Sequence, residues 1–203
     1  MHVDASQFPS VARFIAALPE GLDSYPQCRA KASMVRNLAD EVVFPGHDLA
    51  ALPEPLRLFR EVPVSSWISE THSQAMMLAI YDRCFDDLAQ FGAYAHRQGR
   101  ALLVGPLYAI AFKVVTPAFL VKTATLRWRM FHRGTELTAR RAGEASAEVR
   151  IDHPPGLFGE VVRRGFCEGM RAAIDLATGG GTTFELTGSE PRYATLRLRW
   201  TGS

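Results

Sequence analysis

The sequence lacks the short motifs that mark nucleotide binding or acyl transfer. It contains no GxxxxGK[ST] or GxGxxG phosphate-binding pattern and no GxSxG nucleophile elbow. Its glycine run at 179–181 follows a predicted helix and not a strand, so it indicates a helix end and a connector. A nucleophile, a base and an orienting group cannot be named together. An enzyme is therefore the least favoured function class.

Cysteine and histidine patterns give no support for a disulfide scaffold or a zinc site. The cysteines Cys28, Cys84 and Cys167 are odd in number and form no CxxC pair, which predicts free thiols in a reducing compartment. The six histidines show no HExxH motif and no paired spacing with cysteine. We therefore expect no metal site.

Long apolar runs are also missing. The longest nearly uncharged run, residues 101–112, is too short to span a bilayer and contains Gly105-Pro106. The N-terminus has no cationic segment followed by an apolar run, so no secretory signal is visible. The sequence predicts a soluble, cytoplasmic protein with no membrane partner.

Net charge is small but unevenly distributed. The chain of 203 residues has a formal net charge of only +2, which is too little for a polycation that binds nucleic acid. Residues 1–99 hold 8 basic and 12 acidic residues, whereas residues 100–150 hold 9 basic and 3 acidic residues. No helix-turn-helix or aromatic RNA-binding motif accompanies the basic segment. The basic flank of a core helix is enough to explain the segment, an acidic protein partner is the alternative, and nucleic acid is not expected.

The chain is expected to form one domain, because 47% of its residues are hydrophobic and can fill a substantial core. Residues 1–64 are interrupted by prolines, which block long helices and predict an irregular helical lead-in to the same domain. Residues 65–203 are expected to form its main part. The prolines of the lead-in that motivate this boundary are Pro19, Pro26, Pro45, Pro53, Pro55 and Pro63.

Helical periodicity dominates from residue 65 to residue 134. Ser65 or Ser66 is a suitable N-cap, and apolar residues recur at spacings of three and four through Phe91. Gly92 is expected to divide this stretch into two helices, and a third helix is predicted over 107–115. Thr116-Pro117 then marks a helix start and Gly134 a helix end, which predicts a single helix over 116–133.

The pattern changes to a period of two after Gly134. Residues 135–151 read as two strands joined at Ala142-Gly143, and residues 157–178 carry a helical stripe. A final hairpin follows, in which Ala194, Leu196, Leu198 and Trp200 share one face. The sequence therefore predicts an α+β fold with an N-terminal helical layer packed on an antiparallel ββαββ unit.

This arrangement resembles that of known families. The runs WISETHSQAMMLAIYD and GRALLVGPLYAIAFKVVTPAFLVKTATLRWRMFHRGTEL, the hairpin, the glycine-containing helix and the ending RLRW are similar to uncharacterised families that are abundant in myxobacteria. More distantly, they resemble the superfamily of haem-NO-binding and 4-vinyl-reductase-type small-molecule-binding domains. The resemblance covers residues 60–200 and implies a ligand cavity between the helices and the sheet. The Tyr-x-Ser-x-Arg motif of the haem-binding members is absent.

Two functions compete on these grounds. The first hypothesis is a non-enzymatic sensory or regulatory module that binds a small apolar ligand between the helices and the sheet and signals to a protein partner. Its expected ligand-binding residues are Trp67, His72, Met76, His96 and Trp128. The second hypothesis is a protein-interaction module with a solid core, which docks an acidic partner through residues 100–150. An apolar core without a cavity is the simpler explanation of the aromatic residues, and a cavity inside that core is the alternative.

The cofactor and the oligomeric state stay open. A lone histidine, His72 or His96, could serve as an axial haem ligand in principle, but a hydrogen-bonded or solvent-facing histidine is favoured. Neither histidine can be aligned with the proximal histidine of the haem-binding members. Haem is therefore compatible with the sequence but not favoured.

Overall fold

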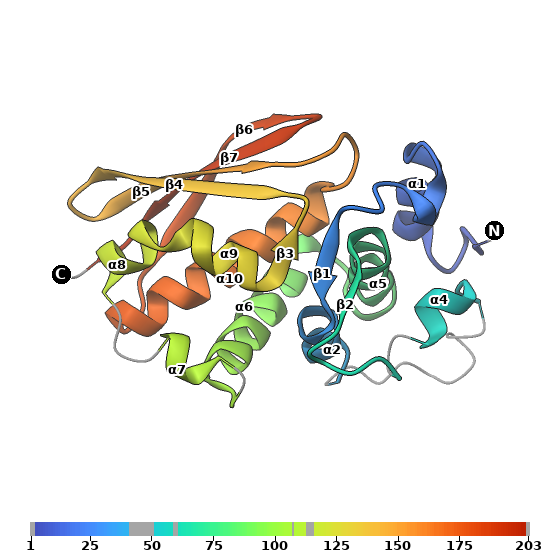
Figure 1. The fold of residues 1–203 in the computed structure, drawn as a ribbon, viewed down its shortest axis with the longest axis horizontal. Helices are drawn as coiled ribbons and strands as arrows, with labels where there is room; N and C mark the ends of the chain where they lie inside the picture. Colours follow the sequence, from blue (N-terminus) through green and yellow to red (C-terminus); the bar gives the residue numbers. More distant parts are fainter. Residues whose placement is uncertain (1–2, 41–50, 59–60, 107, 113–115, 202–203) are drawn as a thin grey trace.

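The fold is layered, with an antiparallel sheet on the outside and helices beneath it. In the computed structural model (Figure 1), the sheet covers helices α8 (Pro117–Lys122), α9 (Ala124–Phe131) and α10 (Glu160–Thr178), and α6 (Leu88–Val104) runs below them. The predicted α+β fold, with a helical layer on an antiparallel ββαββ unit, is confirmed. The structure describes residues 3–40, 51–58, 61–106, 108–112 and 116–201.

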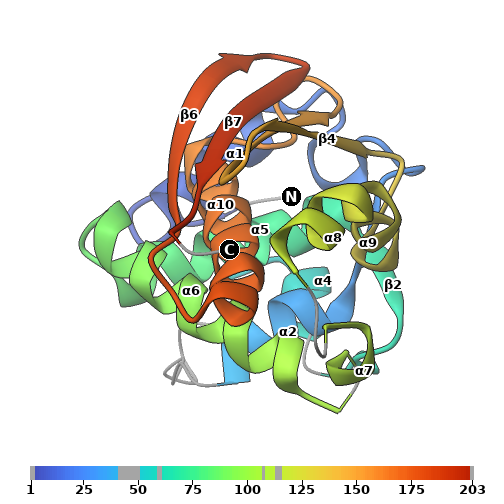
Figure 2. The same ribbon diagram turned by 90° about the vertical axis from the view of Figure 1, so that its left-hand side faces the viewer.

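The larger sheet has the strand order β4-β5-β7-β6. Its strands are β4 (Glu136–Gly143), β5 (Ser146–Asp152), β6 (Thr183–Glu190) and β7 (Tyr193–Arg199), and all neighbours are antiparallel. Seen from the end, β6 and β7 curve over α10 (Figure 2). Alternation along the strands places apolar side chains on the inner face, as the sequence predicts. The buried inner residues include Leu137, Ala147, Val149, Ile151, Ala194, Leu196 and Leu198.

A second, smaller sheet joins three distant parts of the chain. Strand β1 (Arg29–Lys31) lies between β2 (Trp67–Ser69) and β3 (His132–Arg133) in the order β2-β1-β3. Ala30 is paired with Ile68 on one side and with His132 on the other. This sheet was not predicted, because strands of two or three residues carry no recognisable alternation.

The N-terminal helices surround one buried helix. Helix α5 (Glu70–Cys84) is buried along almost all of its length and packs against α1 (Pro9–Ala17), α2 (Ala32–Asp40), α4 (Glu54–Arg57) and α10. A short 3₁₀ turn over Gly21–Asp23 follows α1. One hydrophobic core contains residues from both ends of the chain, such as Phe8 and Leu198. The division at residue 64 stays a prediction.

Two predicted helix boundaries are wrong. The break between the first two helices falls at residues 85–87, and Gly92 lies inside α6. The cause is Asp87, whose carboxylate accepts hydrogen bonds from the backbone N–H groups of Ala89 and Gln90 at 2.8 Å each and so caps α6. The predicted N-cap at Ser65 or Ser66 is also wrong, because residues 67–69 form β2 and α5 begins at Glu70.

The expected helix over 116–133 is divided into α8 and α9. Its start is confirmed, since Thr116 caps α8 by accepting a hydrogen bond from Phe119 N, and Gly134 has the expected positive φ of 73°. The division comes at Thr123, whose hydroxyl donates to the carbonyl of Phe119 at 2.7 Å. Of the helix predicted over 107–115, α7 (Ala109–Phe112) forms, while residues 107 and 113–115 lie outside the described residues.

The turn of the first hairpin is also shifted. It lies at residues 144–145 and not at Ala142-Gly143, because β4 runs through Gly143 with a register irregularity near its end. Helix α10 ends as expected, since Gly179 follows it in the left-handed conformation with φ of 84°.

Candidate functional site

An apolar cavity of about 210 Å³ lies between the larger sheet and the helices below it. Helices α6, α8, α9 and α10 line it from one side and β4, β5 and β7 from the other. Leu102, Leu120, Trp128, Leu137 and Met170 are typical of its wall. It lies where the resemblance to ligand-binding domains implies a cavity, between helices and sheet.

Three glycines line this cavity, and one of them borders free space. Gly165 and Gly169 on α10 and Gly99 on α6 belong to its lining. A Cβ atom added at Gly169 would meet no heavy atom within 4 Å, so this position borders free space. A Cβ atom added at Gly165 would come within 3.1 Å of Met77 Sδ, so that position is close to filled. Gly169 is thus the point on α10 from which a side chain would enter the cavity.

Polar groups are few in the cavity wall. Gln98 of α6, Arg127 of α9 and His132 of β3 are its polar lining residues among those that the structure describes. The Arg127 guanidinium donates from Nε to the hydroxyl of Thr123 at 2.9 Å and lies over the Phe119 ring. Burial lowers the pKa of Arg127 from its usual value. An apolar wall with a few polar groups is the usual composition of a small-molecule site.

His132 lines the cavity and contacts three neighbouring side chains. Its Nδ1 atom lies 2.9 Å from Glu70 Oε2, and both side chains are almost completely buried. Its ring stacks on the indole of Trp128 with centroids 3.8 Å apart, and Phe166 packs edge-on against it. The carboxyl group of Glu70 also accepts a hydrogen bond from Gln74 Nε2. Glu70 therefore fixes His132, and His132 fixes Trp128 in the cavity wall.

Cys28 lies next to this pair but does not complete a catalytic triad. Its Sγ atom contacts the carbonyl oxygen of Gly134 at 3.3 Å. Burial, assisted by the nearby Glu70, raises the pKa of Cys28 to about 11. A thiol with such a pKa is not a nucleophile at neutral pH, because the thiolate is the reactive form.

A hydrogen-bonded pair joins α6 to α10, and ion pairs lie along α10 beside it. His96 Nε2 of α6 lies 2.9 Å from Asp175 Oδ2, and Asp175 also accepts from the backbone N–H of Thr182 at 3.0 Å. Burial raises the pKa of Asp175, but these hydrogen bonds outweigh it and hold the pKa below its usual value. Glu168, completely buried, lies 2.8 Å from Arg164 and 3.2 Å from Arg171. The His96–Asp175 contact links the two helices, whereas Glu168, Arg164 and Arg171 all belong to α10 and pair within that helix.

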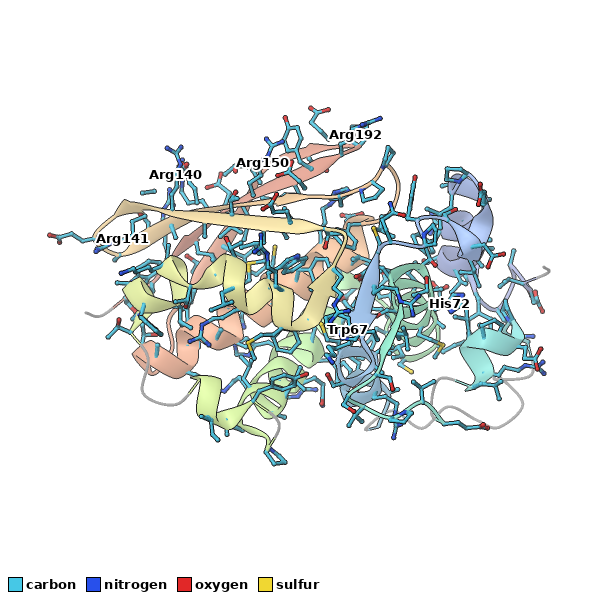
Figure 3. All side chains as sticks on the ribbon, viewed as in Figure 1. Trp67, His72, Arg140, Arg141, Arg150 and Arg192 are labelled. Carbon is cyan, nitrogen blue, oxygen red and sulfur yellow. The ribbon has the colours of Figure 1, made fainter. Side chains whose placement is uncertain are left out.

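The structure places the five sequence-predicted ligand residues in different surroundings. Trp128 lines the cavity, whereas the other four are absent from its lining. Met76 is buried in the core beside α1 and α2, and His96 is bound to Asp175. Trp67 belongs to β2 of the small sheet, and His72 lies in the first turn of α5 (Figure 3). Burial lowers the pKa of His72, while Asp23 raises it and Arg29 lowers it further.

The basic segment 100–150 is spread over several surfaces. Arg140 and Arg150 lie on the open face of the larger sheet (Figure 3), where Arg140 pairs with Glu148 and Arg150 pairs with Asp152. Arg129 of α9 lies 3.6 Å from Glu136. Lys113 lies outside the described residues. Cations of this segment are thus partly neutralised by neighbouring carboxylates.

Metal-ligand clusters and membrane-spanning helices are both missing from the described residues. In these parts of the chain, no three histidine, cysteine, aspartate or glutamate side chains converge to hold a metal ion. Within the same ranges, no helix combines the length and the apolar character needed to cross a bilayer.

Sequence reasoning missed both members of the buried pair. Glu70 is separated from His132 by 62 residues, and the sequence carries no sign that they meet. One signal was available for His132, since it lies four residues after Trp128 at the end of a predicted helix, on the same face. Gly169 lies within the helical stripe predicted over residues 157–178, but its place in the cavity wall depends on what faces it.

Comparison with known proteins identifies solved structures with a similar fold. No protein-family model matches the chain, and a search of curated proteins finds no match. Among solved structures, one from a study of H-NOX activation matches with a TM-score of 0.58 and 10% identity over 86% of this chain and 97% of that one. Another, from a study of haem redox potential and porphyrin distortion, has a TM-score of 0.55 and 7% identity over 83% and 97%.

These matches show that the fold resembles that of H-NOX proteins, as the sequence predicts. The resemblance to 4-vinyl-reductase-type domains stays a prediction. At this identity the likeness concerns the fold alone. The resemblance to myxobacterial families stays a prediction.

Haem does not fit the cavity as it stands. Pockets that bind drug-sized ligands measure about 300–1,000 Å³, and the cavity of about 210 Å³ is below that range. Haem also needs an axial ligand such as histidine. His132 is the histidine that lines the cavity, and its ring is covered by Trp128 at 3.8 Å and flanked by Phe166. His96 is engaged by Asp175.

Proposed function

We propose that the protein is a sensory or regulatory module that binds a small, uncharged and mostly apolar molecule in the cavity between helices and sheet. The observation that carries the proposal is the cavity of about 210 Å³ with an almost wholly apolar wall. Related folds in H-NOX proteins support a sensory role by analogy. We further propose that the module is cytoplasmic and passes its signal to a protein partner.

The cavity volume sets the size of the ligand. An apolar cavity of about 150 Å³ stays dry and binds benzene or xenon. A volume of about 210 Å³ is somewhat larger. The ligand class is therefore a neutral aromatic or aliphatic molecule between benzene and indole in size. A charged ligand would lose its hydration without a matching partner in this wall.

Trp128 is the ligand-binding residue that this proposal retains from the sequence. It reaches the cavity from α9 and stacks on His132 at its inner end. A ligand in the cavity would contact its indole, and its fluorescence would report that contact. Trp67, His72, Met76 and His96 do not contact this cavity and are not part of the proposed site.

The first test is native mass spectrometry with an absorption spectrum on freshly purified protein, which identifies any molecule that co-purifies. The protein is then titrated with benzene, with indole and with haemin. Benzene or indole at about 100 times its Kd is expected to raise the free energy of unfolding by about 2.7 kcal/mol. Haemin is expected to give no specific haem spectrum. Absence of stabilisation by every neutral probe and a bare mass would contradict the proposal.

Filling the cavity from α10 provides the matched test. Gly169→Leu places a side chain in the free space at that position and should weaken the binding of indole by about tenfold or more. Gly159→Ala, at the N-cap of the same helix, is the control, since its Cβ meets no atom within 4 Å and it does not line the cavity. The control should bind indole like the wild type. Equal binding by all three proteins would place the ligand elsewhere.

A further inference from the structure

Three cations and one tryptophan gather on the outer face of the small sheet. Arg29 and Lys31 of β1, Trp67 of β2 and Arg133 of β3 form this cationic sheet face. Side chains alternate between the faces of a sheet, so the intervening residues Ala30 and His132 point inward. Ala30 and His132 are buried, whereas Arg29 and Arg133 are exposed and Lys31 is half-buried. Figure 3 shows Trp67 at this surface.

The cations are held in place around the indole. Lys31 Nζ lies 4.4 Å from the centroid of the Trp67 ring, and Arg133 Cζ lies 4.0 Å from it. Lys31 also donates to the carbonyl of Ser65 at 2.7 Å, and Arg29 donates to the carbonyl of Trp67 at 3.3 Å. Each contact uses part of the donor capacity of its cation, because lysine has three donors and arginine has five. Each of these cations therefore keeps donors beyond the contacts named here.

Positive charge on this face is not neutralised. Arg29 and Arg133 are directly opposite each other in the register of β1 and β3, and like charges in that position destabilise a sheet. Among the residues that the structure describes, no carboxylate lies within ion-pair distance of Arg29, Lys31 or Arg133. The carboxylate of Glu70, next to β2 in sequence, is buried and turned toward His132. This contrasts with the larger sheet, where Arg140 and Arg150 have acidic partners.

We propose that the cationic sheet face docks an acidic segment of a partner protein. Carboxylates supply the missing counter-charges and fit the planar donor array of arginine. Tryptophan and arginine are the residues that dominate binding energy at protein interfaces. Single-stranded nucleic acid is the weaker fit, since it needs open aromatic faces for stacking and the Trp67 ring already carries two cations. The proposal does not rest on the proposed binding of a ligand in the cavity.

The test measures the binding of a fluorescein-labelled glutamate-rich peptide by anisotropy, at about 50 and about 300 mM salt. Arg29→Glu/Arg133→Glu should raise the Kd for the peptide by about tenfold or more. Arg141→Glu/Arg192→Glu is the control, because both side chains are exposed on the larger sheet and its β6–β7 turn (Figure 3) and the change in net charge is the same. The control should change the Kd by less than about twofold. Binding by the wild type should weaken at the higher salt concentration.

An uncharged variant tests whether a loss of peptide binding comes from a folding defect. Arg29→Gln/Arg133→Gln removes the like-charge pair, so it should fold at least as stably as the wild type and still lose peptide affinity. Three results would overturn the proposal: no peptide binding at the lower salt concentration, an equal loss in the control variant, or tighter binding of oligo(dT) or of phosphatidylserine vesicles than of the peptide.

Discussion

At the scale of single residues, the buried carboxyl groups of Glu70 and Asp175 each have hydrogen-bond partners. Glu70 has no exposed surface and is bound by His132 and Gln74, and Asp175 is bound by His96 and Thr182. A buried carboxylate without such partners would carry a large desolvation penalty. These pairs therefore explain how polar side chains are accommodated beside an apolar cavity.

Because two thiols are buried, we expect the free energy of unfolding to fall at alkaline pH. Burial raises the pKa of Cys28 to about 11 and that of Cys167 to about 12. A pKa raised in the folded state means that stability is complete below the ordinary value near 9 and falls as the pH rises above it. The loss is at most about 1.4 kcal/mol per thiol for each pH unit. Urea unfolding under reducing conditions, from about pH 8 to about pH 10.5, measures it.

The variant Cys28→Ala/Cys167→Ala isolates this effect from other groups that titrate in the same range. It should be less stable than the wild type at about pH 8, because two buried side chains are shortened. Its free energy of unfolding should then fall less steeply with pH, so the difference between the proteins narrows. If the free energies of unfolding of the two proteins fall in parallel with pH, the two thiols do not cause the pH dependence.

Individual site residues were only partly predictable. Trp128, on the apolar stripe predicted over residues 116–133, lines the cavity, while its role in ligand binding stays a prediction. His96 was selected for the small residues around it, but its partner Asp175 lies 79 residues away and decides its role. Spacing along the chain identifies a helix face, whereas the groups that meet across elements depend on the assembled fold.

At the scale of elements, α6 and α10 form the central helix pair, and glycines control how they meet. A Cβ atom added at Gly92 of α6 would lie 2.6 Å from Arg164 Nε, and Arg164 is an ion-pair partner of the buried Glu168. At Gly169 of α10, an added Cβ atom meets free space. The same substitution should therefore have opposite effects on the two helices.

We expect Gly169→Ala to raise the free energy of unfolding by about 1 kcal/mol, which is the gain in helix propensity. Gly92→Ala gains the same propensity, but it displaces Arg164 and weakens the pairing of Glu168. We expect it to lower the free energy of unfolding by about 1 kcal/mol or more, because the buried carboxylate loses a partner. Urea denaturation measures both. Stabilisation by Gly92→Ala would show that Arg164 contributes little.

The helices and strands that were predicted are those with strong local signals in the sequence. Helix α10, the hairpin β6–β7 and the inward face of β7 were predicted, since each has a long periodic pattern and glycine or proline at its ends. The small sheet was missed, because β1, β2 and β3 are two or three residues long and belong to parts of the chain that are far apart in sequence. Its formation depends on Gly134, where a Cβ atom would lie 2.5 Å from the carbonyl oxygen of Gln27.

At the scale of the whole molecule, strand β3 connects the cavity with the cationic sheet face. His132 points inward and stacks on Trp128, which lines the cavity, while the next residue, Arg133, points outward and lies over Trp67. A ligand that packs against Trp128 would restrict His132 and, through β3, the position of Arg133. Fixed cations lose less conformational freedom when they bind carboxylates, so the two binding events should support each other.

The resulting prediction is a reciprocal coupling between the two sites. With indole near saturation, the glutamate-rich peptide should bind about fivefold or more tightly, and saturating peptide should tighten indole binding by the same factor. His132→Phe keeps an aromatic ring on Trp128 but removes the bond to Glu70, so both ligands should still bind while the coupling falls. Anisotropy titrations with and without indole measure these factors. If the wild type binds both ligands and neither ligand changes the Kd of the other, then β3 does not couple the cavity to the cationic sheet face.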